Sequence, residues 1–501
     1  MDELLQSTFK YDRFKSYQKS VIEYILKGHD NLVIMPTGSG KSLCYQFPCL
    51  VTSKITIVIS PLIAIMEQQV SELKKFNISS KYYDSNDTTD IIYDIIKYSI
   101  VFITPEKIIN IINKLDVIKD HIGLFAIDEC HCISEWGHDF RPSYTKLGIL
   151  KQLYPIIPII ALTATATNSV ESDIVNKLKL DISNTALTKS SIYRSNLKYI
   201  IRVKIDFETD MNNLYKTDQD KLIPTIIYTN TVKNTDKICN YLVDELGIKC
   251  INYYSSMDRD IKKEIHELFI NDKICCLVAT IAYGMGVHKN NIRRVIHYTP
   301  PASIEQYYQQ VGRAGRDGNE SECILYYNST DFSLPHTKNC VEKSNIMNEY
   351  CCTNKCRNQF ILNYFEDDSN IIKKIGCNCD NCILDTDVKE INLTHEIHIL
   401  LKTIYYTHEI YGAGIIIDIL RGSKKKSIVN KNLNSIQTYG LGKSRTIQWW
   451  KYIITIIQSK YKYIYTKPEY NNIILTSKGK HLLYINNKND VLLKLPDIFN
   501  K

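Results

Sequence analysis

Short apolar runs rich in β-branched residues recur along the first 300 residues, and longer amphipathic stretches separate them. This alternation is typical of parallel α/β sheets, in which a helix connects each buried strand to the next. The runs fall into two series, so we expect two tandem α/β lobes. The first series is 31–35, 54–60, 99–104, 124–128 and 158–164, and the second is 225–230, 248–254, 274–280 and 293–298.

The pattern changes twice more along the chain. We expect lobe 1 over residues 1–202, lobe 2 over 203–335, a helical cysteine-rich element over 336–390 and a small basic domain over 391–501. Residues 391–501 hold 17 Lys and Arg against 6 Asp and Glu, although the whole chain carries only +8. The basic charge is therefore local, and it suits either a phosphate backbone or a solvated lysine-rich face.

Membrane insertion and secretion are not expected. The chain begins MDELLQSTFKYDR without an apolar run, and no stretch approaches the ~20 apolar residues that span a bilayer. We expect an intracellular soluble protein without a membrane partner, with nucleus and cytoplasm both open. The 16 cysteines then favour reduced thiols or a metal site over disulfides.

The segment MPTGSGKS (35–42) has the features of a phosphate-binding loop, because it follows an apolar run and precedes a helix-like stretch. Lys41 would reach the β and γ phosphates of ATP, and Ser42 would hold Mg²⁺. Met35 stands where the strict pattern has Gly. The residues expected to contact ATP are Met35, Pro36, Thr37, Gly38, Ser39, Gly40, Lys41 and Ser42.

Two further motifs carry charges that ATP hydrolysis needs. Asp128 and Glu129 directly follow a strand-like run, so Asp128 can bind Mg²⁺ and Glu129 can polarise the attacking water. In lobe 2, QQVGRAGRDG (309–318) presents Arg313 and Arg316, which could stabilise charge on the transferred phosphoryl group. A helix N-cap and a surface arginine pair are the structural alternatives.

Together these motifs resemble those of superfamily 2 helicases and, within them, the RecQ family, over nearly the whole chain. The family's order is followed by ISPLIAIMEQQV (59–70), TPE (104–106), ALTATAT (161–167), IYRSNLKY (192–199) and ATIAYGMGV (279–287). The resemblance implies two RecA-like lobes, a helical zinc-binding element and a winged-helix domain. It implies an ATP-dependent DNA helicase that moves 3′ to 5′ on single-stranded DNA in repair, recombination or replication.

The resemblance also assigns residues and partners. It implies catalytic roles for His131 and Gln309, and DNA contacts for Ser60 and Thr280. The expected partners are single-stranded and duplex DNA, with other DNA repair or replication proteins as further candidates. ATP, Mg²⁺ and Zn²⁺ are the expected cofactors.

The segment CHCISEWGHDFRPSY (130–144) resembles the family's aromatic-rich loop, which couples single-strand binding to ATP hydrolysis. Trp136, His138, Phe140 and Arg141 combine ring faces for base stacking with a cation. A purely structural core role is disfavoured because charged residues interleave with the rings.

Upstream, YDRFKSYQ (11–18) resembles the adenine-reading motif. Gln18 offers an amide to the adenine edge and Tyr11 offers a stacking face. Lys15 stands where the family usually has Arg, so weaker adenine stacking is expected. His288 also departs from the usual Asp, which weakens any nucleotide role for that position.

The cysteines of GCNCDNC and of CRNQFILNYFED resemble the zinc ligands of the family. The expected ligands are Cys356, Cys377, Cys379 and Cys382, whose thiolates would bind Zn²⁺ tetrahedrally. Only one residue separates Cys377 from Cys379, so Cys351 or Cys352 could replace Cys377. Free buried thiols are the alternative to a metal site.

In the basic domain, segments 410–428, 439–460 and 462–480 predict a helix, a helix and a β-hairpin, and they resemble the RecQ winged helix. Its expected phosphate contacts are Lys424, Lys425, Lys426, Lys443 and Arg445. Tyr465 or Tyr470 on the hairpin could stack on the terminal base pair, although tyrosines in strands more often pack.

Two other functions stay open at this stage. An RNA helicase would share most motor motifs, since the motor contacts mainly backbone and stacked bases. A non-catalytic DNA-binding or annealing protein is the second alternative. The charged residues of the three ATP motifs, all present here, argue against it.

Overall fold

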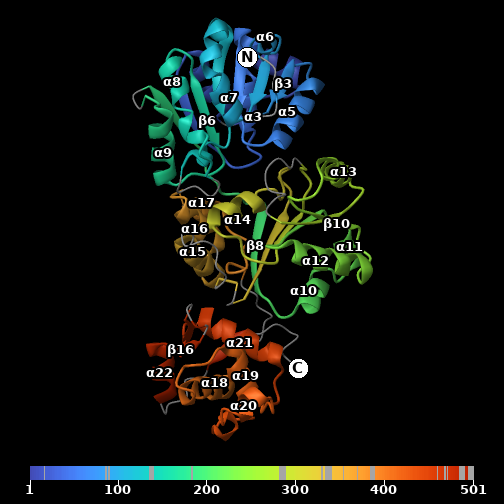
Figure 1. The fold of residues 1–501 in the computed structure, drawn as a ribbon, viewed down its shortest axis with the longest axis vertical. Helices are drawn as coiled ribbons and strands as arrows, with labels where there is room; N and C mark the ends of the chain where they lie inside the picture. The colour runs from blue at the N-terminus through green and yellow to red at the C-terminus, as the bar shows by residue number, and fades with distance from the viewer. Residues whose placement is uncertain are drawn as a thin grey trace.

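In the computed structural model, the five runs of the first series form the inner strands of a seven-stranded parallel sheet, at the top of Figure 1. Its inner strands are buried on both faces because helices cover both, which explains their continuous apolar sequences. The strand order is β3 (Ser80–Tyr83), β4 (Ile100–Ile103), β2 (Ile55–Ile59), β5 (Ile122–Ile127), β6 (Ile159–Thr163), β1 (Asp30–Ile34) and β7 (Thr185–Lys189).

The helices of lobe 1 alternate with these strands along the chain. They are α1 (Asp2–Phe9), α2 (Gln18–Leu26), α3 (Lys41–Gln46), α4 (Pro48–Thr52), α5 (Ile63–Lys75), α6 (Ile92–Ile95), α7 (Pro105–Ile111), α8 (Ile149–Leu153) and α9 (Asn168–Leu178). Short 3-10 helices occupy Ile112–His121, Cys130–Ile133 and Tyr144–Lys146.

Lobe 2 contains a six-stranded sheet whose strands are also all parallel. Its order is β10 (Cys250–Tyr253), β11 (Cys276–Ala279), β9 (Thr225–Tyr228), β12 (Arg294–His297), β13 (Ser321–Tyr327) and β8 (Leu197–Val203). The accompanying helices are α10 (Phe207–Leu214), α11 (Asp218–Lys221), α12 (Val232–Asp244), α13 (Arg259–Ile270) and α14 (Ile304–Val311).

The structure describes most of the chain. The described residues are 1–15, 17–84, 87, 91–134, 140–181, 184–280, 289–328, 331–332, 341–353, 355–368, 370–383, 390–459, 461–467, 470, 472–484 and 491–494. Among them, every helix is too short or too polar to serve as a membrane span.

The expected boundary between the lobes needs a correction. We expected lobe 1 to run to residue 202, but β8 at 197–203 pairs with β13 and is the edge strand of the second sheet. The change of sheet therefore falls in the linker 190–196, after β7. Sequence periodicity cannot show this, because strand pairing depends on a partner more than 100 residues away. The polar stretch after β8 forms α10 and α11.

The cysteine-rich element is helical, as expected, and packs against lobe 2. Its helices are α15 (Val341–Cys352), α16 (Arg357–Tyr364) and α17 (Asn370–Ile375). Met347, Tyr350 and Phe365 belong to the same hydrophobic cluster as Tyr307 of α14. Figure 1 shows the three helices on one side of lobe 2, and Glu366, just after α16, accepts a hydrogen bond from the N–H of Asn168 at the start of α9 in lobe 1.

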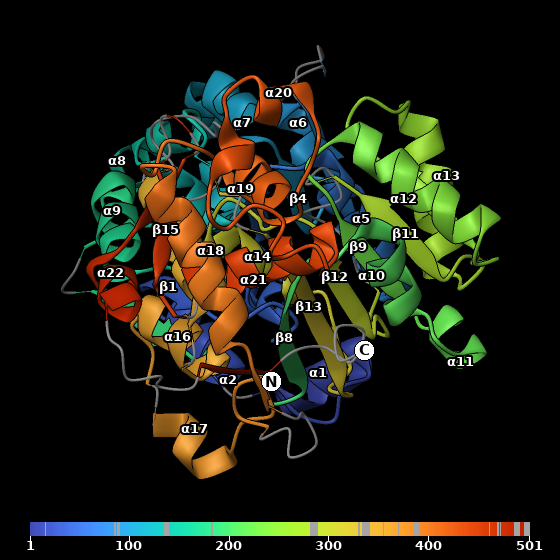
Figure 2. The same ribbon diagram turned by 90° about the horizontal axis from the view of Figure 1, so that it is seen from below.

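The C-terminal domain lies at the other end of lobe 2 and has a hydrophobic core of its own (Figures 1 and 2). Its helices are α18 (Thr394–Tyr406), α19 (Ala413–Leu420), α20 (Lys426–Val429), α21 (Ile447–Ser459) and α22 (Ser477–Tyr484). The expected hairpin is present as β15 (Ile464–Thr466) and β16 (Ile473–Leu475), and β14 (Glu390–Asn392) pairs with β17 (Leu492–Lys494). The predicted first helix is two helices, α19 and α20, and the end of the predicted hairpin is α22.

Candidate active site and zinc site

The predicted phosphate-binding loop lies at the carboxyl end of β1, between Ile34 and the start of α3 at Lys41. Gly40 has a φ of 90°, and a Cβ there would lie 2.5 Å from Gln18 Nε2, so only glycine fits without a shift. Lys41 Nζ donates to the carbonyls of Met35 (2.8 Å) and Pro36 (3.3 Å). Burial lowers the pKa of Lys41, while the carboxylates of Glu129 and Asp128 oppose that shift.

Two of the residues predicted to read adenine, Gln18 and Lys15, contact this loop. Gln18 is buried, accepts a hydrogen bond from the Lys15 N–H (2.7 Å) and donates Nε2 to the carbonyl of Gly40 (2.9 Å). Lys15 Nζ lies 3.5 Å from the carbonyl of Gly38. Tyr11 is half exposed and stacks on Phe9. Gln18 thus connects the N-terminal motif to the phosphate loop.

The acidic pair follows β5 at the same edge of the sheet. The Glu129 N–H donates to Asp128 Oδ1 (3.0 Å), and the Glu129 backbone is left-handed, with a φ of 49°. Such a conformation is uncommon for a residue with a long side chain and often marks a functional turn. Burial, with repulsion from Glu129, raises the pKa of Asp128 to about 7.

His131 links the acidic pair to the ALTATAT segment at the end of β6. Its Nδ1 lies 3.3 Å from Glu129 Oε2 and 3.0 Å from Thr163 Oγ1. Thr163 Oγ1 also donates to the carbonyl of Thr165 (3.1 Å). The ends of two neighbouring strands are therefore joined through one imidazole.

The arginine loop of lobe 2, residues 312–318 after α14, contacts the phosphate loop. Thr37 Oγ1 donates to the carbonyl of Gly312 (3.1 Å), and Arg316 Cγ lies 3.5 Å from the position of a Cβ on Gly38. Arg313 is 3% exposed, and within the described part of the chain its Nε and Nη1 atoms are buried without a hydrogen-bond partner. Burial, with Arg313 and Arg194 nearby, lowers the pKa of Arg316 to about 9.

The guanidinium groups gathered beside the phosphate loop favour binding of a polyphosphate, whose negative charge they would balance.

Gln309, the remaining predicted catalytic residue, lies partly exposed on α14. Arg194 was not predicted as a site residue, although its segment IYRSNLKY contributed to the resemblance. Only the fold shows that its side chain reaches the arginine loop.

The predicted DNA contacts lie on both lobes. Ser60 follows β2 and is buried, and Arg141 Nη1 donates to the carbonyl of the adjoining Pro61 (2.8 Å). Phe140 is 38% exposed, and Thr280 follows β11 in lobe 2. Trp136 and His138, with the atypical His288, lie outside the described residues.

The four predicted zinc ligands come together. The thiol sulfurs of Cys356, Cys377, Cys379 and Cys382 all lie within 4.8 Å of one another. Backbone and amide N–H groups point at three of these sulfurs, as expected around thiolates. Four thiolates at this spacing fit the tetrahedral coordination of Zn²⁺. Cys351 and Cys352, considered as replacements for Cys377, are instead buried in the core shared with lobe 2.

The side chains of the C-terminal domain that are predicted to bind phosphate differ in their exposure to solvent. Lys424 and Lys443 are exposed. Arg445 forms an ion pair with Glu396 (2.7 Å) and lies over the ring of Trp449, so it would have to give up this contact to bind a phosphate. Tyr465, on β15, is 46% exposed, and Tyr470 is 72% exposed.

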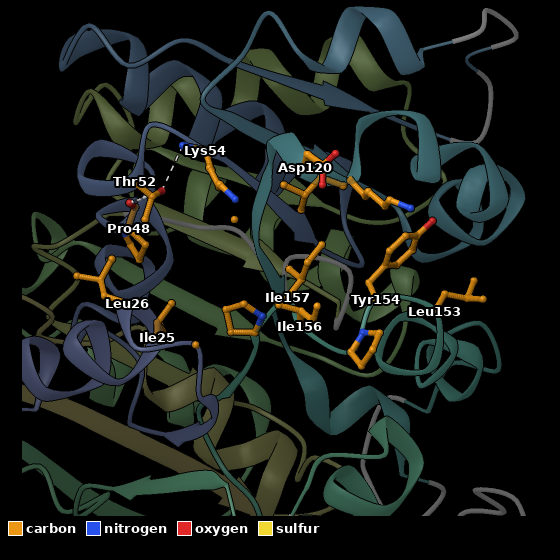
Figure 3. A pocket seen from close by; sticks show the side chains of 16 residues that line it. Ile25, Leu26, Pro48, Thr52, Lys54, Asp120, Leu153, Tyr154, Ile156 and Ile157 are labelled. Carbon is orange, nitrogen blue, oxygen red and sulfur yellow. Dashed lines mark hydrogen bonds between the residues drawn. The ribbon is translucent and has the colours of Figure 1, made fainter.

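A cavity of about 500 Å³ opens at the opposite edge of the first sheet (Figure 3). It is lined by residues that precede or begin the strands, including Gly28, Lys54, Ile122 and Pro158. Ligands of parallel α/β sheets bind at the carboxyl ends of the strands. The cavity is therefore separate from the phosphate loop.

The sequence matches four families in order along the chain. They are DEAD/DEAH box helicase (15–173), helicase conserved C-terminal domain (209–318), RecQ zinc-binding (328–383) and RQC domain (387–498). A solved structure of the helicase MrfA bound to DNA has a TM-score of 0.56 at 21% identity, covering 72% of this chain and 57% of that one. That likeness supports the fold alone.

Similar proteins come from bacteria, animals and a virus. The ATP-dependent DNA helicase RecQ of Bacillus subtilis is 35% identical, over 96% of this chain and 83% of its own length. R290 of Acanthamoeba polyphaga mimivirus, named provisionally as an ATP-dependent RNA helicase, is 36% identical over 90% of this chain and 85% of its own.

The bifunctional 3′-5′ exonuclease/ATP-dependent helicase WRN of Mus musculus is 34% identical over 96% of this chain, which spans 37% of that protein. These matches, together with the two-lobed fold and the grouped cysteines, show that the chain belongs to the RecQ family of superfamily 2 ATP-dependent DNA helicases.

Proposed function

We propose that this chain couples ATP hydrolysis between its lobes to 3′ to 5′ movement along single-stranded DNA, while the C-terminal domain holds the duplex ahead. The observation that carries the proposal is the contact of the arginine loop with the phosphate loop, through Thr37 and Gly312. A site completed by two lobes opens and closes with each nucleotide, which gives the motor its stroke.

Within this site, each predicted residue has a distinct task. Lys41 binds the β and γ phosphates, and Glu129 orients and polarises the attacking water. Arg313, whose Nε and Nη1 are buried and find no hydrogen-bond partner among the described residues, stabilises charge on the transferred phosphoryl group together with Arg316. Ser42 and Asp128 would hold Mg²⁺, which neutralises phosphate charge when bound.

The DNA path runs over the carboxyl ends of the strands in both lobes. Ser60, Phe140 and Arg141 lie on lobe 1 and Thr280 on lobe 2, and we assign Trp136 and His138 to the same path. Lys424, Lys443 and, after release from Glu396, Arg445 bind duplex phosphates, and Tyr465 is the residue that stacks at the junction. Zn²⁺ is held by Cys356, Cys377, Cys379 and Cys382.

The test is the ATPase rate with and without single-stranded DNA, beside Lys41→Ala and Trp136→Ala. We expect DNA to raise the wild-type rate, Lys41→Ala to abolish hydrolysis and Trp136→Ala to remove the stimulation while keeping the basal rate. No hydrolysis under any condition would leave a DNA-binding or annealing protein on a helicase fold.

The name of the viral relative R290 favours a second candidate, an RNA helicase. Strand displacement on DNA and RNA duplexes of the same sequence separates the two functions, and so does a comparison of 3′ and 5′ single-stranded tails. Displacement of RNA alone would overturn the DNA assignment while leaving the motor intact.

A further inference from the structure

The linker between the two sheets, residues 190–196, is held from the side of the zinc-binding element. Asp367, just after α16, accepts hydrogen bonds at Oδ2 from the Ser191 hydroxyl and the Ile192 N–H, both at 2.8 Å. Beside it, Glu366 Oε2 accepts from the N–H of Asn168 (3.0 Å), the first residue of α9. Two adjacent carboxylates of the zinc-binding element therefore hold the linker and lobe 1.

The same linker holds the arginine loop on its other side. Arg194 donates Nη1 to the carbonyl of Gly312 (3.2 Å) and Nη2 to the carbonyl of Ala314 (3.0 Å), and it also contacts the carbonyl of Gly315. These carbonyls flank Arg313 in the sequence. One planar guanidinium thus fixes the backbone on both sides of that arginine.

Helix α14 adds a third attachment. The Tyr308 hydroxyl, buried on α14, donates to the carbonyl of Ile192 (2.6 Å), and Asn196 Nδ2 donates to the carbonyl of Gly315 (2.9 Å). The linker is therefore a short rigid bridge whose two ends are fixed by different parts of the molecule. A displacement of Asp367 would be passed to Arg194 and so to the arginine loop.

We propose that Arg194 is a positioning residue for the arginine loop, and that Asp367 fixes the linker from which Arg194 reaches it. The zinc-binding element then acts on ATP hydrolysis through the linker. This rests on the proposed function, in which Arg313 and Arg316 stabilise the transferred phosphoryl group. Small displacements of such groups are costly, since about 1 Å of misplacement can lower a rate about a hundredfold.

The first experiment compares Arg194→Ala and Arg194→Lys with Arg202→Ala, an exposed arginine on β8 that donates to the Tyr326 hydroxyl. For Arg194→Ala we expect DNA-stimulated kcat to fall about thirtyfold to a hundredfold, while zinc content and the affinity for a fluorescent ATP analogue stay within about twofold. Arg194→Lys should recover part of kcat, and Arg202→Ala should match wild type. An unchanged kcat for Arg194→Ala, or equal losses of kcat and nucleotide affinity, would overturn the positioning role.

The second experiment tests the connection to the zinc-binding element. Asp367→Ala is compared with Asp368→Ala. Within the described residues, the Asp368 carboxylate accepts a hydrogen bond only from the nearby Asn370 N–H. We expect Asp367→Ala to lower kcat about tenfold at unchanged zinc content, and the double variant with Arg194→Ala to lose little more than Arg194→Ala alone. Additive losses would overturn the connection.

Arg313→Ala in the same assay distinguishes a failure of the inference about the linker from a failure of the proposed role of the arginine loop. If Arg313→Ala abolishes hydrolysis and Arg194→Ala has no effect, the inference about the linker fails alone. If Arg313→Ala itself leaves kcat unchanged, the proposed role of the arginine loop fails.

Discussion

The zinc-binding element and the C-terminal domain both follow lobe 2, yet they join it in different ways. The zinc-binding element contributes Met347, Tyr350 and Phe365 to the core of lobe 2, and its Glu366 reaches lobe 1. The C-terminal domain packs around Trp450 in a core that is mostly its own. The first is therefore structurally part of the motor, whereas the second is a separate module attached to it.

The largest expected effect comes from breaking the zinc site. Cys379→Ser should reduce zinc content and abolish DNA-stimulated ATPase, because metal binding supplies about 10 kcal/mol or more of folding free energy to such elements. Zinc content and ATPase rate are measured together. Cys275→Ser, which removes a partly exposed thiol of lobe 2, is the control. Full ATPase activity in zinc-free protein would contradict the shared core.

Charge reversal in the C-terminal domain should separate duplex binding from hydrolysis. Lys424→Glu with Lys443→Glu should weaken duplex DNA binding at least about tenfold and lower the slope of log affinity against log salt by about two. ATPase stimulated by single-stranded DNA should stay within about twofold. Lys216→Glu, an exposed lysine of lobe 2, is the matched control. A parallel loss of ATPase would show that the module is not separate.

A packing change should destabilise the C-terminal domain alone. In Gly442→Ala the new Cβ would lie 2.5 Å from Trp450 Cζ2, so we expect a loss of about 1–3 kcal/mol in the free energy of unfolding of this domain. Two of the chain's three tryptophans are in α21, so tryptophan fluorescence reports the transition. Gly414→Ala, where a Cβ would meet no atom of the described residues within 4 Å, should not destabilise it. An equal shift in lobe 2 would contradict separate cores.

The smallest effect concerns lobe 2 near its junction with the C-terminal domain. Burial raises the pKa of Asp210, on α10, to about 7. The folded state then binds this proton more tightly than the unfolded chain, so its contribution to stability is present below about pH 4 and is lost as pH rises towards 7.

Asp210→Asn should therefore raise the melting temperature of lobe 2 at pH 8 by a few degrees and change it little at pH 4. Asn can still accept from the Tyr298 hydroxyl, which now donates to Asp210 Oδ2. Calorimetry at the two pH values measures the difference. Equal stabilisation at both pH values would exclude the raised pKa as the cause.

The sequence predicted features that depend on residues close together in the chain, and it missed features that depend on partners far apart in the chain. The phosphate loop and the acidic pair were predicted because each directly follows its own strand, and parallel strands bring their carboxyl ends together. The assignment of β8 to lobe 1 was wrong because its partner β13 lies far along the chain. The contacts of Arg194 with Gly312 and of Asp367 with Ser191 could not be predicted, since 118 and 176 positions separate the partners in the sequence.

The shared core of lobe 2 and the zinc-binding element also determines where the protein can be divided. A fragment that ended after β13 would leave Tyr307 and its aromatic neighbours open to water, because Tyr350 and Phe365 cover that side of the sheet. A division between residues 383 and 390 would keep the buried residues of each core together and, among the described residues, would separate only Val203 and Ile205 of lobe 2 from the C-terminal core that they pack against. Protease cleavage there should release two folded fragments. One would be an ATPase without the domain proposed to bind duplex DNA, and the other would be that basic domain.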